Sequence, residues 1–199
     1  RRNPLVTAVL HPGRLGNFFR PLAREAWFAL LLPLTGGHPL LFHVVQFAVF
    51  ALALVLLADL LSVFAPQRPH AVAPAVLAGV LWFAVLPFQR VNLLWVSCTQ
   101  DLLALTLALG AFALYRRDRV LPSLLVFVAA TLAKESALPL PGVLFLWSWW
   151  IEKRSPWRAF ARVLPFGLAL VPWLVGELTL RQHSLAAARF TFDASHFAA

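Results

Sequence analysis

Several residue types are missing or rare in this chain of 199 residues. It contains no methionine, so its first residue is no initiator, and we expect it to be a piece of a longer protein. A single cysteine, Cys98, excludes an internal disulfide, and no Asn-x-Ser/Thr glycosylation site occurs. The N-terminal residues lack the pattern of a signal peptide.

Charge is scarce as well, and this sets the class of protein. Charged residues make up 13% of the chain, hydrophobic residues 61%, and the mean hydropathy is +0.78. These values exclude an ordinary soluble domain and indicate a polytopic membrane protein. The net charge of +9 does not indicate a nucleic-acid partner, because the basic residues lie in short loops between apolar runs, where membrane topology accounts for them. Eight Trp and seventeen Phe, many near the ends of those runs, are typical of interfacial aromatic belts.

The apolar runs predict the fold class. A helix needs about 20 residues to cross a bilayer, and the runs lie at Leu40–Phe64, Ala71–Phe88, Leu93–Tyr115, Leu121–Ile151 and Val163–Leu180. We therefore expect an all-α, polytopic helical membrane bundle of about six spans over residues 38–180. Residues 1–37 are expected to form an outer-face loop with an amphipathic segment at Leu22–Leu34. Residues 181–199 are expected to form an outer-face tail that leads to a missing C-terminal region.

The basic loops predict the topology. The loops at residues 65–70, 116–119 and 152–158 are short and rich in Arg and Lys, so the positive-inside rule assigns them to the cytoplasm. An even number of crossings must then join the last two loops. Leu121–Ile151 is long for one helix, and we predict two short helices hinged at Lys134–Pro141. The hinge then lies on the outer side, together with Arg90, Asn92, Gln100 and Asp101.

Lys134 and Glu135 interrupt an otherwise apolar stretch. A charge at membrane depth costs roughly 2.5–3.5 kcal/mol on insertion scales, so charges there are rare and usually functional. Lys134 is also one of only two lysines in a chain with fifteen arginines. The two residues either neutralise each other or line a pocket for a charged ligand. Consecutive helical side chains point about 100° apart, which favours the pocket.

Arginines gather in the N-terminal segment, on the face that the topology marks as outer. Six charged residues there sum to +4: Arg1, Arg2, Arg14, Arg20, Arg24 and Glu25. The guanidinium fork suits a lipid phosphate, and Arg20 is the first candidate to bind one. The alternatives are anchoring to anionic headgroups, an inverted orientation or, for Arg20, capping of the amphipathic segment.

Three further residues are candidates for substrate binding, and each has a plain alternative. Arg90 binds phosphate or simply snorkels to the interface. Asp101 opens an apolar run, where it either belongs to the site or complements the helix N-terminus. His43, with Gln46 on the same helical face, binds phosphate or sugar or hydrogen-bonds another helix. The six histidines show no metal-ligand spacing, and we predict neither metal nor cofactor.

Five motifs follow one another in an order that resembles a known family. They are Asn3-Pro4-Leu5-Val6; Phe19-Arg20-Pro21-Leu22; Gly37-His38-Pro39 with Phe42-His43 and Gln46; Pro87, Trp95 and Ser97 with Asp101-Leu102-Leu103; and Lys134-Glu135 with Leu138-Pro139. They resemble the protein O-mannosyltransferase-like glycosyltransferases of the C superfamily, multi-spanning enzymes that use dolichyl- or polyprenyl-phosphate sugars. The resemblance covers about residues 3–155, and it depends on the order and spacing of motifs that are each weak alone.

The chain departs from this family at several positions. Where the family's outer loop often carries two histidines and a glutamate, this chain has Leu86, Gln89 and Val91. Cys98-Thr99-Gln100 replaces the family's Gly-Arg-Lys, and Gln46 replaces an asparagine. These departures leave the sugar and the acceptor open. The family's catalytic acid precedes its Asn-Pro-x-Val stretch, so the resemblance puts that residue upstream of Arg1.

The resemblance implies an integral membrane glycosyltransferase that moves a sugar, a hexose such as mannose, from a polyprenyl- or dolichyl-phosphate carrier to a protein or glycan hydroxyl on the outer face. The partners are then this lipid-linked sugar, the acceptor and membrane lipid. The residues expected to bind substrate are Arg20, His43, Arg90, Asp101, Lys134 and Glu135. The arginine-rich, lysine-poor usage is typical of a GC-rich bacterium, with the site facing the periplasm from the inner membrane. The alternatives are a non-catalytic protein that binds or transports a lipid-linked sugar, and a structural membrane subunit.

Overall fold

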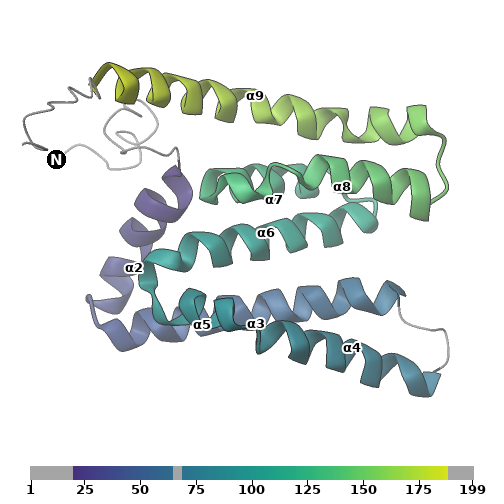
Figure 1. The fold of residues 1–199 in the computed structure, drawn as a ribbon, viewed down its shortest axis with the longest axis horizontal. Coiled ribbons are helices and arrows are strands. Elements are labelled where there is room, and N and C mark those ends of the chain that lie inside the picture. The colour runs from purple at the N-terminus through teal and green to yellow at the C-terminus, as the bar shows by residue number, and fades with distance from the viewer. Residues whose placement is uncertain (1–19, 65–68, 188–199) are drawn as a thin grey trace, which may run out of the picture.

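The computed structural model describes residues 20–64 and 69–187, and within these ranges helices are the only regular secondary structure (Figure 1). In chain order the elements are η2 (Leu22–Ala26), α2 (Trp27–Thr35), α3 (Pro39–Phe64), α4 (Pro69–Ala84), α5 (Pro87–Leu94), η3 (Val96–Cys98), α6 (Thr99–Arg116), α7 (Val120–Ala133), η4 (Glu135–Ala137), α8 (Leu140–Leu146), η5 (Trp147–Ile151) and α9 (Pro156–Ala187). The predicted all-α class is therefore confirmed. The predicted N-terminal motif at residues 3–6 lies outside the described residues.

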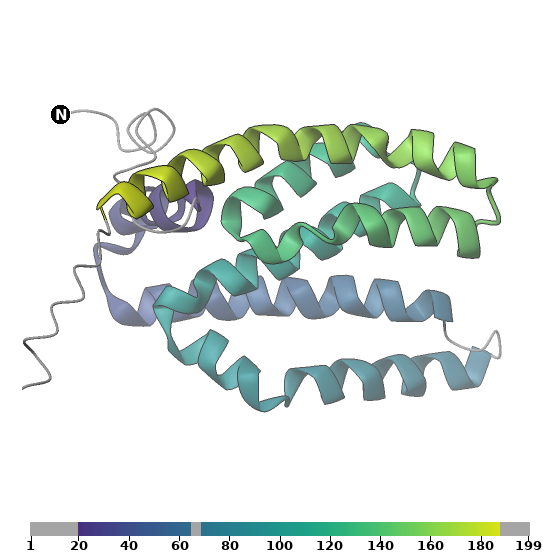
Figure 2. The same ribbon diagram turned by 45° about the horizontal axis from the view of Figure 1, so that its top comes forward.

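Helix α6 forms the centre of the bundle. Figures 1 and 2 show it between α3 and the antiparallel α7, with α9 lying along α7 and α8 and with α4 paired to α3. The core between these helices is aromatic. Tyr115 and Phe127 are fully buried, and their rings pack 5.7 and 5.6 Å from the ring of Phe166 on α9. Offset and edge-on contacts of this kind add to the stabilisation from burial alone.

The two ends of the bundle differ in what they hold. One end holds the end of α3, the α6–α7 turn and the α8–α9 turn, and the other holds α2, the start of α6 and the break between α7 and α8 (Figures 1 and 2). The basic loops at residues 116–119 and 152–158 therefore lie at one end, as the topology argument predicts. Residues 65–68 of the third basic loop lie outside the described residues.

The α7–α8 break confirms the predicted hinge. Helix α7 ends at Ala133 because Lys134 has extended backbone angles, φ −162° and ψ 147°. The single turn of η4 follows, and α8 then begins at Leu140, with Pro139 just before it and Pro141 in its first turn. Helix α8 runs back toward the end where α7 began (Figure 1). Proline is favoured at such a helix start because its missing N–H has no partner to lose there.

Three helices of the described residues are long and apolar enough to cross a membrane: Pro39–Phe64, Val96–Arg116 and Pro156–Thr179. A fourth candidate is the pair Pro74–Ala84 and Pro87–Leu94, bent by 62° at its break. The expected number of about six spans is thus met only in part. Helix α7 has 14 residues and, at ~1.5 Å per residue, extends about 21 Å, short of a hydrocarbon core of ~30 Å.

The described part of the segment before α3, expected as a loop with an amphipathic stretch, is helical. The π-turn η2 leads directly into α2, which ends at Gly36. Gly36 and Gly37 have φ of +58° and +77°, in the left-handed region that glycine adopts without steric strain. The two glycines let the chain turn sharply into α3, so η2 comes to lie over the start of α6 and the end of α7.

Candidate functional site

Arg20 and Glu135 meet across 115 residues of sequence. The Nε of Arg20 donates a hydrogen bond of 2.8 Å to Oε2 of Glu135, and Nη2 donates to Oε1, so the carboxylate is held by two parallel bonds. The Nη1 of the same guanidinium donates a 2.8 Å bond to Oε1 of Gln100. Two-point binding of this kind fixes both the position and the plane of the guanidinium.

A second ion pair lies beside the first. The Nζ of Lys134 donates to Oδ1 of Asp101, which stands in the first turn of α6. Lys134 and Glu135 thus each pair with a residue from another element and do not neutralise each other. The extended backbone of Lys134 explains this, because successive side chains of an extended chain point to opposite sides. We call these five residues, Arg20, Gln100, Asp101, Lys134 and Glu135, the ion-pair cluster.

The cluster is partly buried. Side-chain exposure is 11% for Arg20, 21% for Lys134, 34% for Asp101 and 37% for Glu135. In this setting charges interact more strongly than at an open surface, and a charge that loses its partner is costly. Burial raises the pKa of the Glu135 carboxyl, but the hydrogen bond and charge of Arg20 lower it further, so the pKa lies below its ordinary value of 4.5. Glu135 is therefore ionised at neutral pH.

Small residues bring the three segments of the cluster together. Ala23 of η2, Ala104 of α6 and Ala133 of α7 form one buried group with Leu103. Alanine lets helix backbones approach closely, so η2 packs tightly over the start of α6 and the end of α7. Arg20 stands two residues before η2, which brings its guanidinium to the first turn of α6 and the α7–α8 break.

Two cavities flank the ion-pair cluster. One, of about 650 Å³, is lined by Asp101 and Ser136 on the cluster side and by apolar residues such as Phe83 and Phe88 on the other. We call it the mixed cavity. The second, of about 440 Å³, is lined by Ala23, Arg24, Glu25, Phe28, Ser97 and Gln100. We call it the polar cavity. Of the ion-pair cluster, Asp101 lines the mixed cavity and Gln100 lines the polar cavity, while the two cations, Arg20 and Lys134, lie behind these residues and line neither.

His43 and Arg90 lie apart from the cluster. The Nδ1 of His43 is 3.2 Å from the backbone oxygen of Leu93, and Nε2 of Gln46 donates bonds of 3.1 Å to the backbone oxygens of Asn92 and Trp95. These bonds join α3 to the end of α5. Of the two roles expected for His43, the structure therefore favours a hydrogen bond to another helix. Arg90 is exposed on α5 and makes no hydrogen bond to any described residue.

Four of the six predicted binding residues therefore belong to one cluster, and one member was not predicted. Gln100 was expected on the outer side but was not counted as a binding residue. The signal was present in the sequence, because Gln100 directly precedes Asp101 at the start of an apolar helix. Among residues 20–64 and 69–187, no group of three or more His, Cys, Asp or Glu side chains is arranged to hold a metal ion.

Comparison of the chain with models of protein families, with curated proteins and with solved structures finds no match.

Proposed function

We propose that the chain is part of an integral membrane glycosyltransferase of the C superfamily type. It moves a hexose from a polyprenyl-phosphate carrier to a protein or glycan hydroxyl on the periplasmic face of a bacterial inner membrane. The supporting observation is that Arg20, Asp101 and Lys134-Glu135, which come from three motifs far apart in the sequence, meet in one cluster. This cluster lies at the end of the bundle opposite the basic loops at residues 116–119 and 152–158, as an outward-facing site requires.

The chemistry of the transfer needs what the cluster contains. When the sugar leaves its carrier, negative charge builds up on the lipid phosphate, and fixed cations lower the energy of that state. The guanidinium fork of Arg20 can bind two phosphate oxygens, while Lys134 supplies a second positive charge. Glu135 and Asp101 hold these cations in place before the donor arrives. In this proposal the base that deprotonates the acceptor lies upstream of Arg1.

The two cavities suit the two substrates. In the proposal the donor occupies the mixed cavity, where its first isoprene units contact Phe83 and Phe88. Its phosphate displaces the lining carboxylate of Asp101 to reach Lys134, the partner of that carboxylate. The acceptor, which presents hydroxyl groups, occupies the polar cavity beside Glu25 and Gln100. The ring of Phe28 there offers an apolar face of the kind that packs against a sugar.

The proposal also keeps six membrane spans for the chain. Two of them are short, namely α7 and α8.

A second candidate is a protein that binds or transports the lipid-linked sugar without cleaving it. One observation favours it: both cations of the cluster are already neutralised by carboxylates. A phosphate must then compete with Glu135 or Asp101 for its cation. This competition lowers affinity, but it also allows release of the lipid, which a carrier needs as much as an enzyme does.

The test is sugar transfer by the full-length protein in nanodiscs. The donors are polyprenyl-phosphate-mannose and polyprenyl-phosphate-glucose, the acceptors are a mixed pool, and the readouts are released polyprenyl phosphate and labelled acceptor. We expect Arg20→Ala and Lys134→Ala to lower turnover by about 100-fold or more, the effect of removing one donor to a developing charge. Arg119→Ala removes an exposed arginine at the opposite end and should leave turnover unchanged.

Single variants leave a carboxylate unpaired and can unfold the protein. The double variants Arg20→Ala/Glu135→Ala and Lys134→Ala/Asp101→Ala remove each pair without a net charge, and a folded double variant must also lose turnover. If the wild type binds both donors but releases no lipid phosphate, the enzyme proposal is wrong and the carrier proposal takes its place.

A further inference from the structure

A cationic cavity lies at the end of the bundle that holds the α8–α9 turn. It has a volume of about 450 Å³ and is lined by Leu146, Trp149, Trp150, Lys153 and Arg154. None of these residues belongs to the ion-pair cluster. We call this cavity the cationic mouth.

The backbone holds the two cations at this mouth. The turn η5 ends with hydrogen bonds of 3.0 Å from the N–H of Glu152 to the oxygen of Trp147 and from the N–H of Arg154 to the oxygen of Ser148. Lys153 sits between them with φ of +56°, in the left-handed region typical of a helix C-terminus. The position of the two cations is therefore set by the end of a helix and not by a free loop.

The two cations differ in what they contact. Arg154 donates from Nε to Oε2 of Glu152 at 2.6 Å and from Nη2 to Oδ1 of Asp118 at 3.4 Å. Lys153 is exposed and forms no ion pair with any described residue. Arg154 is thus a fixed cation with part of its fork engaged, while Lys153 keeps its full charge for a ligand.

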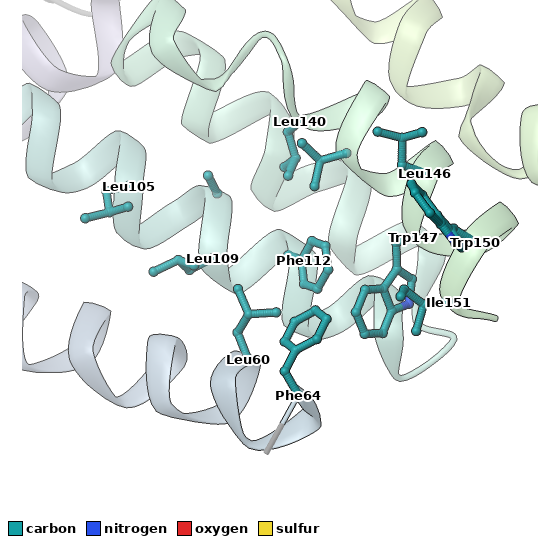
Figure 3. A pocket seen from close by; sticks show the side chains of 12 residues that line it. Leu60, Phe64, Leu105, Leu109, Phe112, Leu140, Leu146, Trp147, Trp150 and Ile151 are labelled. Carbon is teal, nitrogen blue, oxygen red and sulfur yellow. The ribbon is translucent and has the colours of Figure 1, made fainter. Parts of the chain in front are cut away.

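An apolar groove adjoins the mouth. This groove has a volume of about 360 Å³ and shares Leu146 and Trp150 with the mouth. Its twelve lining side chains come from α3, α6, α8 and η5, and none is charged (Figure 3). On α6 the lining runs from Leu105 to Phe112, about 10 Å at ~1.5 Å per residue. Figure 3 shows Trp147, Trp150 and Ile151 at one end and Leu105 at the other.

The surroundings are those of a membrane interface. Trp150 is 68% exposed and Trp157, at the start of α9, is 76% exposed. Exposed tryptophan beside Lys and Arg is typical of the level where lipid headgroups meet the acyl chains. The described residues at this end include seven basic side chains against three acidic ones, namely Arg116, Arg117, Arg119, Lys153, Arg154, Arg158 and Arg162 against Asp59, Asp118 and Glu152. The excess of positive charge attracts anionic lipid.

We propose that the cationic mouth and the apolar groove together bind one anionic phospholipid. Its phosphate lies between Lys153 and Arg154, and one acyl chain enters the groove past Leu146 and Trp150. The site suits both parts of a phospholipid. The mouth supplies two cations for the phosphate, and the groove is wholly apolar, as an acyl chain requires. It lies at the other end of the bundle from the ion-pair cluster and does not depend on the transferase proposal.

A polyprenyl chain is the competing occupant. The groove shares Leu105 and Ala108 with the mixed cavity, so a donor lipid held at the ion-pair cluster could extend its tail into the same space. Such a tail would bring no phosphate to Lys153. A requirement for Lys153 in binding therefore distinguishes a phospholipid from a polyprenyl tail in the groove.

The experiment measures lipid binding by native mass spectrometry of the purified protein in detergent. The probes are phosphatidylglycerol and phosphatidylcholine with identical acyl chains, and glycerol phosphate as the headgroup without chains. We expect one phosphatidylglycerol to bind more tightly than phosphatidylcholine, and glycerol phosphate not to bind. Lys153→Gln should weaken phosphatidylglycerol about fivefold, the loss expected for one cation at a lipid surface. Val143→Trp, which places a bulky side chain in the groove, should weaken both lipids.

Two matched variants decide whether the site is specific. Arg158→Gln removes one exposed cation at the same end outside the mouth, and Leu125→Trp adds a tryptophan on α7 outside the groove. Both should bind phosphatidylglycerol as the wild type does. If Lys153→Gln and Arg158→Gln lower the affinity for phosphatidylglycerol equally, general surface charge explains the binding and the proposal is wrong. Displacement of phosphatidylglycerol by polyprenyl phosphate with no effect of Lys153→Gln would also overturn it, and would assign the groove to the donor.

Discussion

At the scale of single residues, opposite charges form pairs where the apolar helices end. Side chains that are neighbours in sequence can belong to different pairs. Lys134 and Glu135 face different partners because one extended residue reverses the direction of the side chain. A bidentate Arg–carboxylate bond with an Arg that is 11% exposed is stronger than a surface pair, since water and ions screen it less. The cluster therefore contributes to the stability of the fold, whichever ligand it binds in the proposed function.

The Arg20–Glu135 pair predicts a pH dependence of stability. The folded-state pKa of Glu135 lies below 4.5, so the pair stabilises the protein above the unfolded-state pKa and loses this contribution as pH falls through the folded-state value. We expect Glu135→Gln to lower the free energy of unfolding by about 1–3 kcal/mol at pH 7. The difference between wild type and variant should shrink below pH 4.5.

The measurement is thermal unfolding in detergent for both proteins from neutral to acidic pH. Glu25→Gln removes a carboxylate of η2 that takes no part in the two ion pairs, and it should change the midpoint little at any pH. A destabilisation by Glu135→Gln that stays constant into acid would contradict the assignment, because a protonated Glu135 cannot bind Arg20 as a carboxylate does.

At the scale of elements, the close pairing of α3 and α4 depends on glycine. A Cβ added at Gly79 would lie 2.9 Å from Cδ1 of Leu61 on α3. Gly142 and Gly167, in α8 and α9, have open space at the same position. The first glycine is thus needed for packing, while the other two only cost helix propensity.

Substitutions at Gly79 and Gly167 should change the stability of the protein in opposite directions. Gly79→Leu should destabilise the protein by about 1–3 kcal/mol through overpacking against α3, and Gly79→Ala less, because the tip of Leu61 can move. Gly167→Ala should stabilise it by about 0.5–1 kcal/mol, the gain of alanine over glycine inside a helix. Unfolding midpoints in detergent test the set. Equal effects of Gly79→Leu and Gly167→Leu would show that α3 and α4 do not approach closely at this glycine.

The sequence predicted some elements well and others poorly, for physical reasons. The hinge at Lys134–Pro141 was predictable because three signals agree there. These are the two charges, the prolines, and the even number of crossings needed between two basic loops on the same side. The four residues that meet in the cluster were predictable as candidates because a charge within or beside an apolar run is costly unless a partner or a ligand compensates it. Helix α5 and its 62° bend were not predicted, since Gln89 and Arg90 belong to a polar patch that ends the apolar run Ala71–Phe88. The partners of Arg20 were also out of reach, because no local pattern relates residues 115 positions apart.

At the scale of the whole molecule, charge is sorted between two ends. The ion-pair cluster lies at one end, and the excess of basic residues at the turns of α6–α7 and α8–α9 lies at the other. For a bundle with this asymmetry, the positive-inside rule predicts an orientation in the bilayer with the basic turns on the cytoplasmic side.

Cysteine labelling in intact cells tests this orientation. The single native cysteine allows a simple background, Cys98→Ser, in which Ser136→Cys and Arg119→Cys each add one exposed thiol at opposite ends. We expect a membrane-impermeant maleimide to label Ser136→Cys in intact cells and Arg119→Cys only after permeabilisation. The reverse pattern would mean the inverted orientation, and a cytoplasmic ion-pair cluster.

The distance in sequence between Arg20 and Glu135 also matters during synthesis. The two side chains are separated by 115 residues, which a ribosome adds in roughly 6–23 s at ~5–20 residues per second. Throughout this interval Arg20 has been synthesised while Glu135 does not yet exist. In the proposed orientation, a nascent chain that carries the arginine outward lacks this carboxylate, and the phosphates of the surrounding leaflet are its nearest counter-ions. We expect the finished site to be assembled by exchange, when the α7–α8 hairpin forms and its carboxylate takes the arginine from the lipid.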